Sequence, residues 1–192
     1  MVKITPPLSK QPIPPQAKRV FGGIIFDVYQ WEQKLFDGTT KTFEKLKRPA
    51  TVMVLPVIDD KILLTEQEQP GVQPFIGAIG GIQDKGEGPL ETAKRELFEE
   101  AGYEARDWKL WQAVQMVDKI DWVAYTFIAR GLLQKPMMNP DTGEKITLKW
   151  VSFEEFVDLV ADERFRDVEI SLAVLRAYKQ NKLEDLRKVL FY

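Results

Sequence analysis

The strongest constraint in this sequence is a set of acidic residues near the end of a predicted helix. Its apolar positions repeat at helical spacing: Leu90, Ala93, Leu97 and Ala101. Glu96, Glu99 and Glu100 share a neighbouring stripe, and Gly102 follows the expected last residue. Like charges at this spacing cost about 0.2–0.5 kcal/mol per pair, and carboxylates in a last turn oppose the helix dipole. A hard divalent cation, Mg²⁺ or Mn²⁺, would offset this cost.

This acidic helix belongs to a longer pattern. The segment from Gly81 to Tyr103 resembles the Nudix box, G-x5-E-x7-R-E-U-x-E-E-x-G-U, in which U is a bulky apolar residue. Every specified position is filled: Gly81, Glu87, Arg95, Glu96, Leu97, Glu99, Glu100, Gly102 and Tyr103. A merely solvated acidic helix face would explain neither the glycine positions nor the fixed distance to Glu87.

Composition narrows the chemistry. The 192 residues are 44% hydrophobic, which suits one globular enzyme domain. A net charge of −2 does not favour nucleic acid or an acidic membrane as a partner. No apolar run is long enough for a membrane span or a secretory signal, so we expect a cytoplasmic protein. The chain contains no cysteine and no histidine, which excludes thiol catalysis and zinc sites built on imidazole or thiolate.

The sequence divides into three parts. Residues 1–19 are a proline-rich N-terminal arm, expected to be either a disordered tail or an extended segment that packs on this domain or on a second subunit. Residues 20–49 are N-terminal strands predicted to serve dimerisation and substrate binding, with a turn at Asp37-Gly38. Residues 50–192 form the predicted Nudix hydrolase domain.

Local patterns predict the remaining elements. The expected strands are 22–29, 31–36, 41–46, 51–58, 61–66, 75–79, 109–117, 122–129 and 146–151. Asp59-Asp60 is the turn of one hairpin, and residues 131–144 are read as a long functional loop. Ser152 and Glu155 form the capping box of a helix, and 168–190 reads as two short helices.

This order of elements resembles the Nudix fold over about residues 50–160: an α/β protein of the α+β type, with a mixed β-sheet sandwiched between helices. The extra N-terminal antiparallel strands are similar to those of the ADP-ribose and nucleotide-sugar pyrophosphatase branch. That branch implies a homodimer whose N-terminal strands reach toward the partner.

The resemblance also implies a reaction. It is metal-dependent hydrolysis of the pyrophosphate bond of a nucleoside diphosphate linked to another moiety, by attack of water. Glu96, Glu99 and Glu100 would ligate the metal beside the carbonyl of Gly80. Arg95 is expected to orient these acids, with Glu91, Glu99 and Glu87 within its reach. The general base is expected to be Glu144, with Asp141 and Glu99 as alternatives.

Substrate contacts are assigned more loosely. Tyr29 and Trp31 are candidate stacking platforms for a base, although core packing is equally compatible with their strand positions. Glu44 could accept from an adenine amino group, and Arg48 could pair with phosphate. The branch usually carries an arginine in the segment that here runs from Leu64 to Pro70, where this chain has none. The segment before the box also departs from the usual pattern, which favours a related nucleotide sugar or another diphosphate over ADP-ribose itself.

Two other functions stay open from the sequence. The chain could hydrolyse nucleoside triphosphates or dinucleoside polyphosphates, or it could be a Nudix-fold regulatory module that binds nucleotide without turnover. The complete set of box acids favours an enzyme acting on a small-molecule nucleotide.

Overall fold

The computed structural model describes residues 4–136 and 145–192. Its larger sheet contains β4 (Thr51–Ile58), β5 (Lys61–Glu68), β6 (Phe75–Gly77), β7 (Ile79–Ile82), β8 (Tyr103–Val114), β10 (Ala124–Gln134) and β11 (Lys145–Ser152). The strand order is β11-β5-β4-β10-β8, with β6 paired to β5 and β7 paired to β4. The sheet is mixed, because β4 and β10 run parallel whereas the other pairs run antiparallel.

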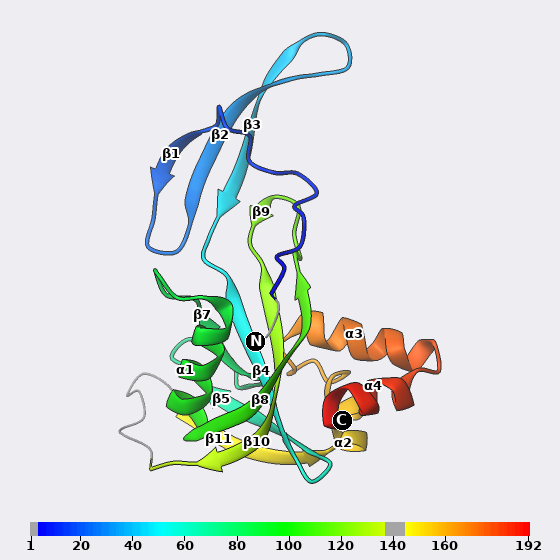
Figure 1. The fold of residues 1–192 in the computed structure, drawn as a ribbon. Helices are drawn as coiled ribbons and strands as arrows, with labels where there is room; N and C mark the ends of the chain where they lie inside the picture. The colour runs from blue at the N-terminus through cyan, green and yellow to red at the C-terminus, as the bar shows by residue number, and fades with distance from the viewer. Residues whose placement is uncertain (1–3, 137–144) are drawn as a thin grey trace.

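Helices cover both faces of this sheet (Figure 1). They are α1 (Pro89–Ala101), α2 (Phe153–Leu159), α3 (Val168–Lys179) and α4 (Leu183–Phe191). Strand β4 is buried on both sides, so its apolar residues alternate between two cores. Val52 and Val54 pack in the core on the α1 side, whereas Met53 and Leu55 pack in the core with residues of α2, α3 and α4. This arrangement confirms the predicted sandwich of a mixed sheet between helices.

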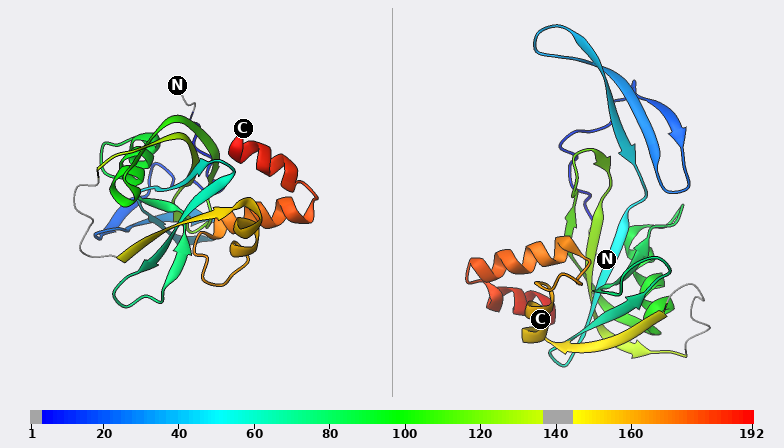
Figure 2. Two further views of the ribbon diagram at one scale, coloured as in Figure 1. Left: turned by 90° about the horizontal axis from the view of Figure 1, so that it is seen from below. Right: turned by 180° about the vertical axis from the view of Figure 1, so that it is seen from behind.

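A second sheet extends away from the sandwich (Figure 2). It contains β1 (Lys18–Gly22), β2 (Asp27–Lys34), β3 (Thr40–Lys47) and the short β9 (Ile120–Asp121), in the order β1-β2-β3-β9. The predicted turn at Asp37-Gly38 joins β2 to β3, and Gly38 has φ 85°. The first strand ends at Gly22, so residues 23–26, expected to be strand, instead form the turn between β1 and β2.

The N-terminal arm packs on its own chain. The ammonium group of Lys45, a fully buried side chain of β3, donates to the carbonyl of Gln11 and lies 3.5 Å from the hydroxyl of Ser9. Ile4 packs against the core on the α1 side. Of the two readings of the arm, the described residues 4–17 therefore follow the packed one. No helix within the described ranges is long and apolar enough to cross a membrane.

Candidate active site

Local sequence fixes the acidic helix α1. Pro89 starts the helix, and the carboxylate of Glu91 accepts from the backbone N–H of Gly88 at 2.7 Å, which satisfies a donor at the helix start. Gly102 ends the helix with φ 68°, a left-handed conformation that favours glycine. Ala93 and Leu97 are buried against the sheet. The acids of the box are thereby held along the side of the helix that borders β7.

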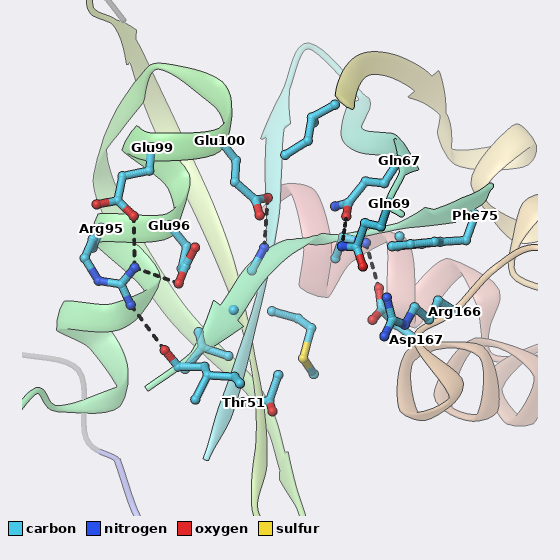
Figure 3. Close-up of a pocket in the computed structure, with 18 of the residues that line it drawn as sticks. Thr51, Gln67, Gln69, Phe75, Arg95, Glu96, Glu99, Glu100, Arg166 and Asp167 are labelled. Atoms are coloured by element: carbon cyan, nitrogen blue, oxygen red, sulfur yellow. Dashed lines mark hydrogen bonds and ion pairs between the residues drawn. The ribbon is translucent and has the colours of Figure 1, made fainter. Parts of the chain in front are cut away.

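The box acids line a cleft of about 1020 Å³ between α1 and the far edge of the sheet. Figure 3 shows Glu96, Glu99 and Glu100 on the α1 side, and Gln67, Phe75 and Arg166 on the opposite side. Of the residues predicted for the site, the cleft brings together Arg48, Gly80, Gly81, Arg95, Glu96, Glu99 and Glu100. The predicted metal ligands and one predicted phosphate ligand therefore share one cavity.

Arg95 organises the acids, as the sequence predicts. Its guanidinium donates to Glu87 at 3.0 Å, to Glu96 at 2.7 Å and to Glu99 at 2.9 Å. Partial burial opposes its charge, but the bonds to Glu87 and Glu99 raise the pKa of Arg95 above its ordinary value. The expected contact with Glu91 is absent, because that carboxylate caps the helix start instead.

The charge of each acid follows from its surroundings. Burial raises the pKa of Glu96, and the neighbouring Arg95 opposes this effect. Hydrogen bonds from Arg95 and Thr92 lower the pKa of Glu87. Glu87 thus supports Arg95 as a fixed anion, whereas burial works against the charge of Glu96.

The donor set suits a hard divalent cation. A Cβ at position 81 would lie 2.3 Å from Oε1 of Glu96, so only glycine lets this carboxylate lie against β7. On the same strand, the backbone N–H of Gly80 donates to Glu100 at 3.2 Å. Carboxylate and carbonyl oxygens are ligands that Mg²⁺ and Mn²⁺ accept. Within the described residues no three acids form a ready-made metal cluster, and Arg95 is bound to both Glu96 and Glu99.

Arg48 occupies the side of the cleft nearest the N-terminal sheet. Its guanidinium lies 4.9 Å from the ring centre of Trp122 and 5.7 Å from that of Phe26. It donates to the hydroxyl of Thr51 at 3.1 Å, and burial lowers its pKa. Among the described residues no carboxylate pairs with it, so its charge can serve a phosphate.

Three predicted substrate residues lie outside this cleft, in the N-terminal sheet. Trp31 is buried and packs on Phe43 at a ring-centre distance of 6.0 Å. Glu44 is exposed and accepts from Gln30 at 2.7 Å, and Tyr29 is half-buried on β2. Within one chain these residues do not meet the box acids. The predicted base Glu144 and its alternative Asp141 lie outside the described residues.

Sequence reasoning missed a group of residues at the far end of the cleft. It comprises Gln67 at the end of β5, Gln69 just after that strand, Phe75 on β6, Arg166 and Asp167 just before α3, and Glu169 in its first turn. Asp167 accepts from the backbone N–H of Ala78 at 2.7 Å, and burial raises its pKa to about 7. Burial also raises the pKa of Glu169. No local motif marks these residues, although four of the six residues from Arg164 to Glu169 are charged.

Comparison with known proteins agrees with this geometry. The chain is 29% identical over 163 residues to the ADP-ribose pyrophosphatase of Bacillus subtilis (strain 168), covering 82% of this chain and 87% of the relative. It is 27% identical over 174 residues to the methanol dehydrogenase activator of Bacillus methanolicus, covering 88% and 94%. It is 25% identical over 148 residues to the ADP compounds hydrolase NudE of Escherichia coli (strain K12), covering 74% and 78%.

A solved structure described as "Crystal structure of ADP compounds hydrolase" has the same fold, with a TM-score of 0.70 and 22% identity over 92% of this chain and 99% of that one. The sequence model of the NUDIX domain matches residues 47–173, well over half of the chain. That match spans the acidic helix α1, the strands β4 to β11 and the residues of the cleft from Arg48 to Glu169. The chain belongs to the Nudix family of hydrolases.

Proposed function

We propose that this protein hydrolyses the pyrophosphate bond of a nucleoside diphosphate linked to another moiety, of the ADP-ribose or nucleotide-sugar type, with Mg²⁺ or Mn²⁺ as cofactor. The observation that carries the proposal is the cleft itself. It combines three box glutamates on one wall with Arg48, a guanidinium without a carboxylate partner among the described residues, on another. Two of the relatives bear names that refer to ADP-ribose or ADP compounds.

Each wall of the cleft has a distinct task in this reaction. When bound, a divalent cation neutralises charge on the phosphate oxygens and lowers the pKa of its bound water. Glu96, Glu99 and Glu100 would hold it, together with the carbonyl of Gly80. Arg95 would keep Glu96 and Glu99 in place through its fork of N–H donors. Arg48 would bind a phosphate oxygen of the substrate by a charge-assisted hydrogen bond.

The group that takes the proton from water is proposed to be Glu144. Its role stays a prediction from sequence, because residue 144 lies outside the described ranges. Glu99 is the alternative within the box. Its side chain is 54% exposed, and one carboxylate oxygen is engaged by Arg95, which leaves the other oxygen accessible to water.

We also propose a homodimer built through the N-terminal sheet. Apolar side chains are unusually exposed there: Val20, Phe21, Ile24 and Phe36. Exposed apolar patches of this kind mark interaction surfaces. A second copy of the chain would cover them, and it would give Tyr29 and Glu44 a route to the partner's nucleotide. Trp31 is better explained as a core residue of its own sheet because it is buried.

A substrate screen tests the proposed function. Purified protein is incubated with Mg²⁺ or Mn²⁺ and with ADP-ribose, nucleotide sugars, diadenosine polyphosphates or nucleoside triphosphates, and the products are identified. We expect a sugar phosphate and the corresponding nucleoside monophosphate from the first two classes, which is AMP for ADP-ribose. Faster hydrolysis of diadenosine polyphosphates or nucleoside triphosphates would instead assign the protein to the hydrolases that act on those compounds. Tight binding of ADP-ribose without any product would indicate a regulatory module.

A further inference from the structure

We propose that Arg166, Phe75, Gln67 and Gln69 form a subsite for a neutral, hydroxyl-rich sugar joined to the second phosphorus of the substrate. The proposal rests on the proposed function, because it names what the far end of the same cleft binds. These residues lie across the cleft from the box acids (Figure 3). A substrate whose diphosphate meets the box acids would place one of its two ends there.

Arg166 is positioned as a ligand-binding group. Its guanidinium carbon lies 4.5 Å from the centre of the Phe75 ring. The backbone N–H of Arg166 donates to the carbonyl of Ile76 at 2.9 Å, which ties this loop to β6. Within the described residues Arg166 forms no ion pair, whereas Arg95 contacts three carboxylates of the box. A guanidinium held against a ring keeps its N–H edge available for a ligand.

A row of polar side chains continues the subsite along β5. Gln67 is buried, and its amide donates to the hydroxyl of Thr65 at 3.0 Å. Thr65 donates in turn to the carbonyl of Gly77 at 3.1 Å. The amide of Gln69 lies 3.4 Å from the carboxamide oxygen of Gln67. These residues alternate along the strand and so share one face. A carboxamide both donates and accepts, as does a sugar hydroxyl, so the row matches a polyol.

The charges at this end favour a sugar over a phosphate. Asp167 and Glu169 line the same part of the cleft as Arg166. An additional phosphate would meet these two acidic groups as well as one guanidinium and would be repelled by whichever of them is ionised, whereas a neutral sugar would not be repelled. A second nucleobase is also disfavoured, because Arg166 already covers one face of the Phe75 ring. The subsite therefore distinguishes nucleotide sugars from dinucleoside polyphosphates.

The test compares a sugar-bearing substrate with one that has no sugar. Arg166→Met keeps an apolar stem over Phe75 but removes every N–H donor. ADP-ribose and ADP-glucose carry the sugar, and the β-methyl ester of ADP has the same pyrophosphate without it. We expect kcat/KM for both sugar substrates to fall about 10-fold to 100-fold, mainly through KM, as for the loss of one or two bonds to a charged group. The methyl ester should change less than about twofold.

The matched control is Arg164→Met in the same loop. Arg164 pairs with Asp162 at 2.8 Å and does not line the cleft, so this variant should process all three substrates like the wild type. An equal loss on the methyl ester and on the sugar substrates would overturn the subsite, because Arg166 would then act on the diphosphate or on the fold. An unchanged preference for the sugar substrates would overturn it as well.

Failure of the proposed function gives a different result. In that case the wild type hydrolyses none of the three compounds with either metal. Calorimetric titration then tests the subsite without turnover, because it gives the ratio of the affinities for ADP-ribose and for the methyl ester. Arg166→Met should remove the preference of the wild type for ADP-ribose. A wild type without any preference, or a variant that keeps it, would overturn the subsite independently of catalysis.

Discussion

Asp167 offers a quantitative test of how the cleft is built, through the pH dependence of stability. Burial raises its pKa from 3.8 to about 7. Because the folded-state value is the higher one, the stabilisation is complete below pH 3.8 and is lost as the pH rises through 7. At 1.36 kcal/mol per pKa unit the full loss is about 4 kcal/mol, of which roughly 2–3 kcal/mol falls between pH 5 and 8.

Asp167→Asn isolates this contribution. The asparagine keeps an oxygen that can accept from the N–H of Ala78, but it cannot ionise. Urea denaturation measures the free energy of unfolding of both proteins at pH 5 and at pH 8. Between these two pH values, the free energy of unfolding of the variant should rise by about 2–3 kcal/mol relative to that of the wild type. Glu169, whose pKa burial also raises, is present in both proteins, and its charge is one of the causes that raise the pKa of Asp167.

Asp162→Asn is the control for the pH series. The hydrogen bonds from Arg164 lower the pKa of this half-buried aspartate to about 2, so its contribution is present above pH 3.8 and is lost only at lower pH. The difference between this variant and the wild type should not vary from pH 5 to 8. If the Asp167→Asn difference is equally constant over that range, the buried ionisation described for Asp167 does not exist.

Three further predictions concern the site and the assembly. Arg95→Lys replaces a guanidinium that binds three carboxylates by a single ammonium group, so kcat should fall at least about tenfold and the free energy of unfolding should fall by about 1–3 kcal/mol. Unchanged kinetics would contradict the orienting role of Arg95. Glu144→Gln should lower kcat by about 10²–10⁴ with little change in KM, and full turnover in steady-state assays would transfer the role of base to Glu99. Deleting residues 1–19 removes the contacts of Lys45 with the arm, so light scattering should show a weaker dimer. A full-length protein that is monomeric at micromolar concentration would contradict the proposed dimer.

The elements that the sequence predicted well are determined by local interactions. The hairpin of β4 and β5 turns at Asp59-Asp60, both of which have positive φ, as short polar turn residues tolerate. Helix α2 starts at the predicted capping box, where Ser152 accepts from the N–H of Glu155 at 3.2 Å. In both cases residues within a few positions of each other supply the hydrogen bonds.

The errors in strand boundaries come from pairing between distant segments. Strand β5 continues beyond its predicted end at Glu66 to Glu68, because the polar end of the strand is paired with β11. Strands β8 and β10 are longer than expected and pair from Tyr103 to Val114, so part of the predicted loop after residue 131 is strand. The apolar run around Ile24 suggested a strand, yet it forms an exposed turn.

The same distinction applies to the candidate site. Arg95 and its glutamates lie within one helix and the segment before it, so a fixed spacing reveals them. Arg166 meets Phe75 only because the loop before α3 is hydrogen-bonded to β6. Trp122 reaches Arg48 from the connection between β8 and β10. No spacing in the sequence encodes these contacts, which depend on the packing of the whole sheet.

The most direct test of the central claim is the rate of ADP-ribose hydrolysis by the wild type and by Glu100→Gln, each at saturating Mg²⁺ and with excess chelator. Glutamine keeps an oxygen that can accept from the N–H of Gly80 and removes one of the adjacent negative charges on α1, so the variant should fold with wild-type or slightly higher stability in the absence of metal. We predict that the chelator abolishes wild-type turnover and that the variant loses at least about 100-fold of kcat at saturating metal. Near-full turnover of Glu100→Gln at saturating Mg²⁺, or wild-type turnover that survives the chelator, would contradict a metal-dependent mechanism based on the box glutamates.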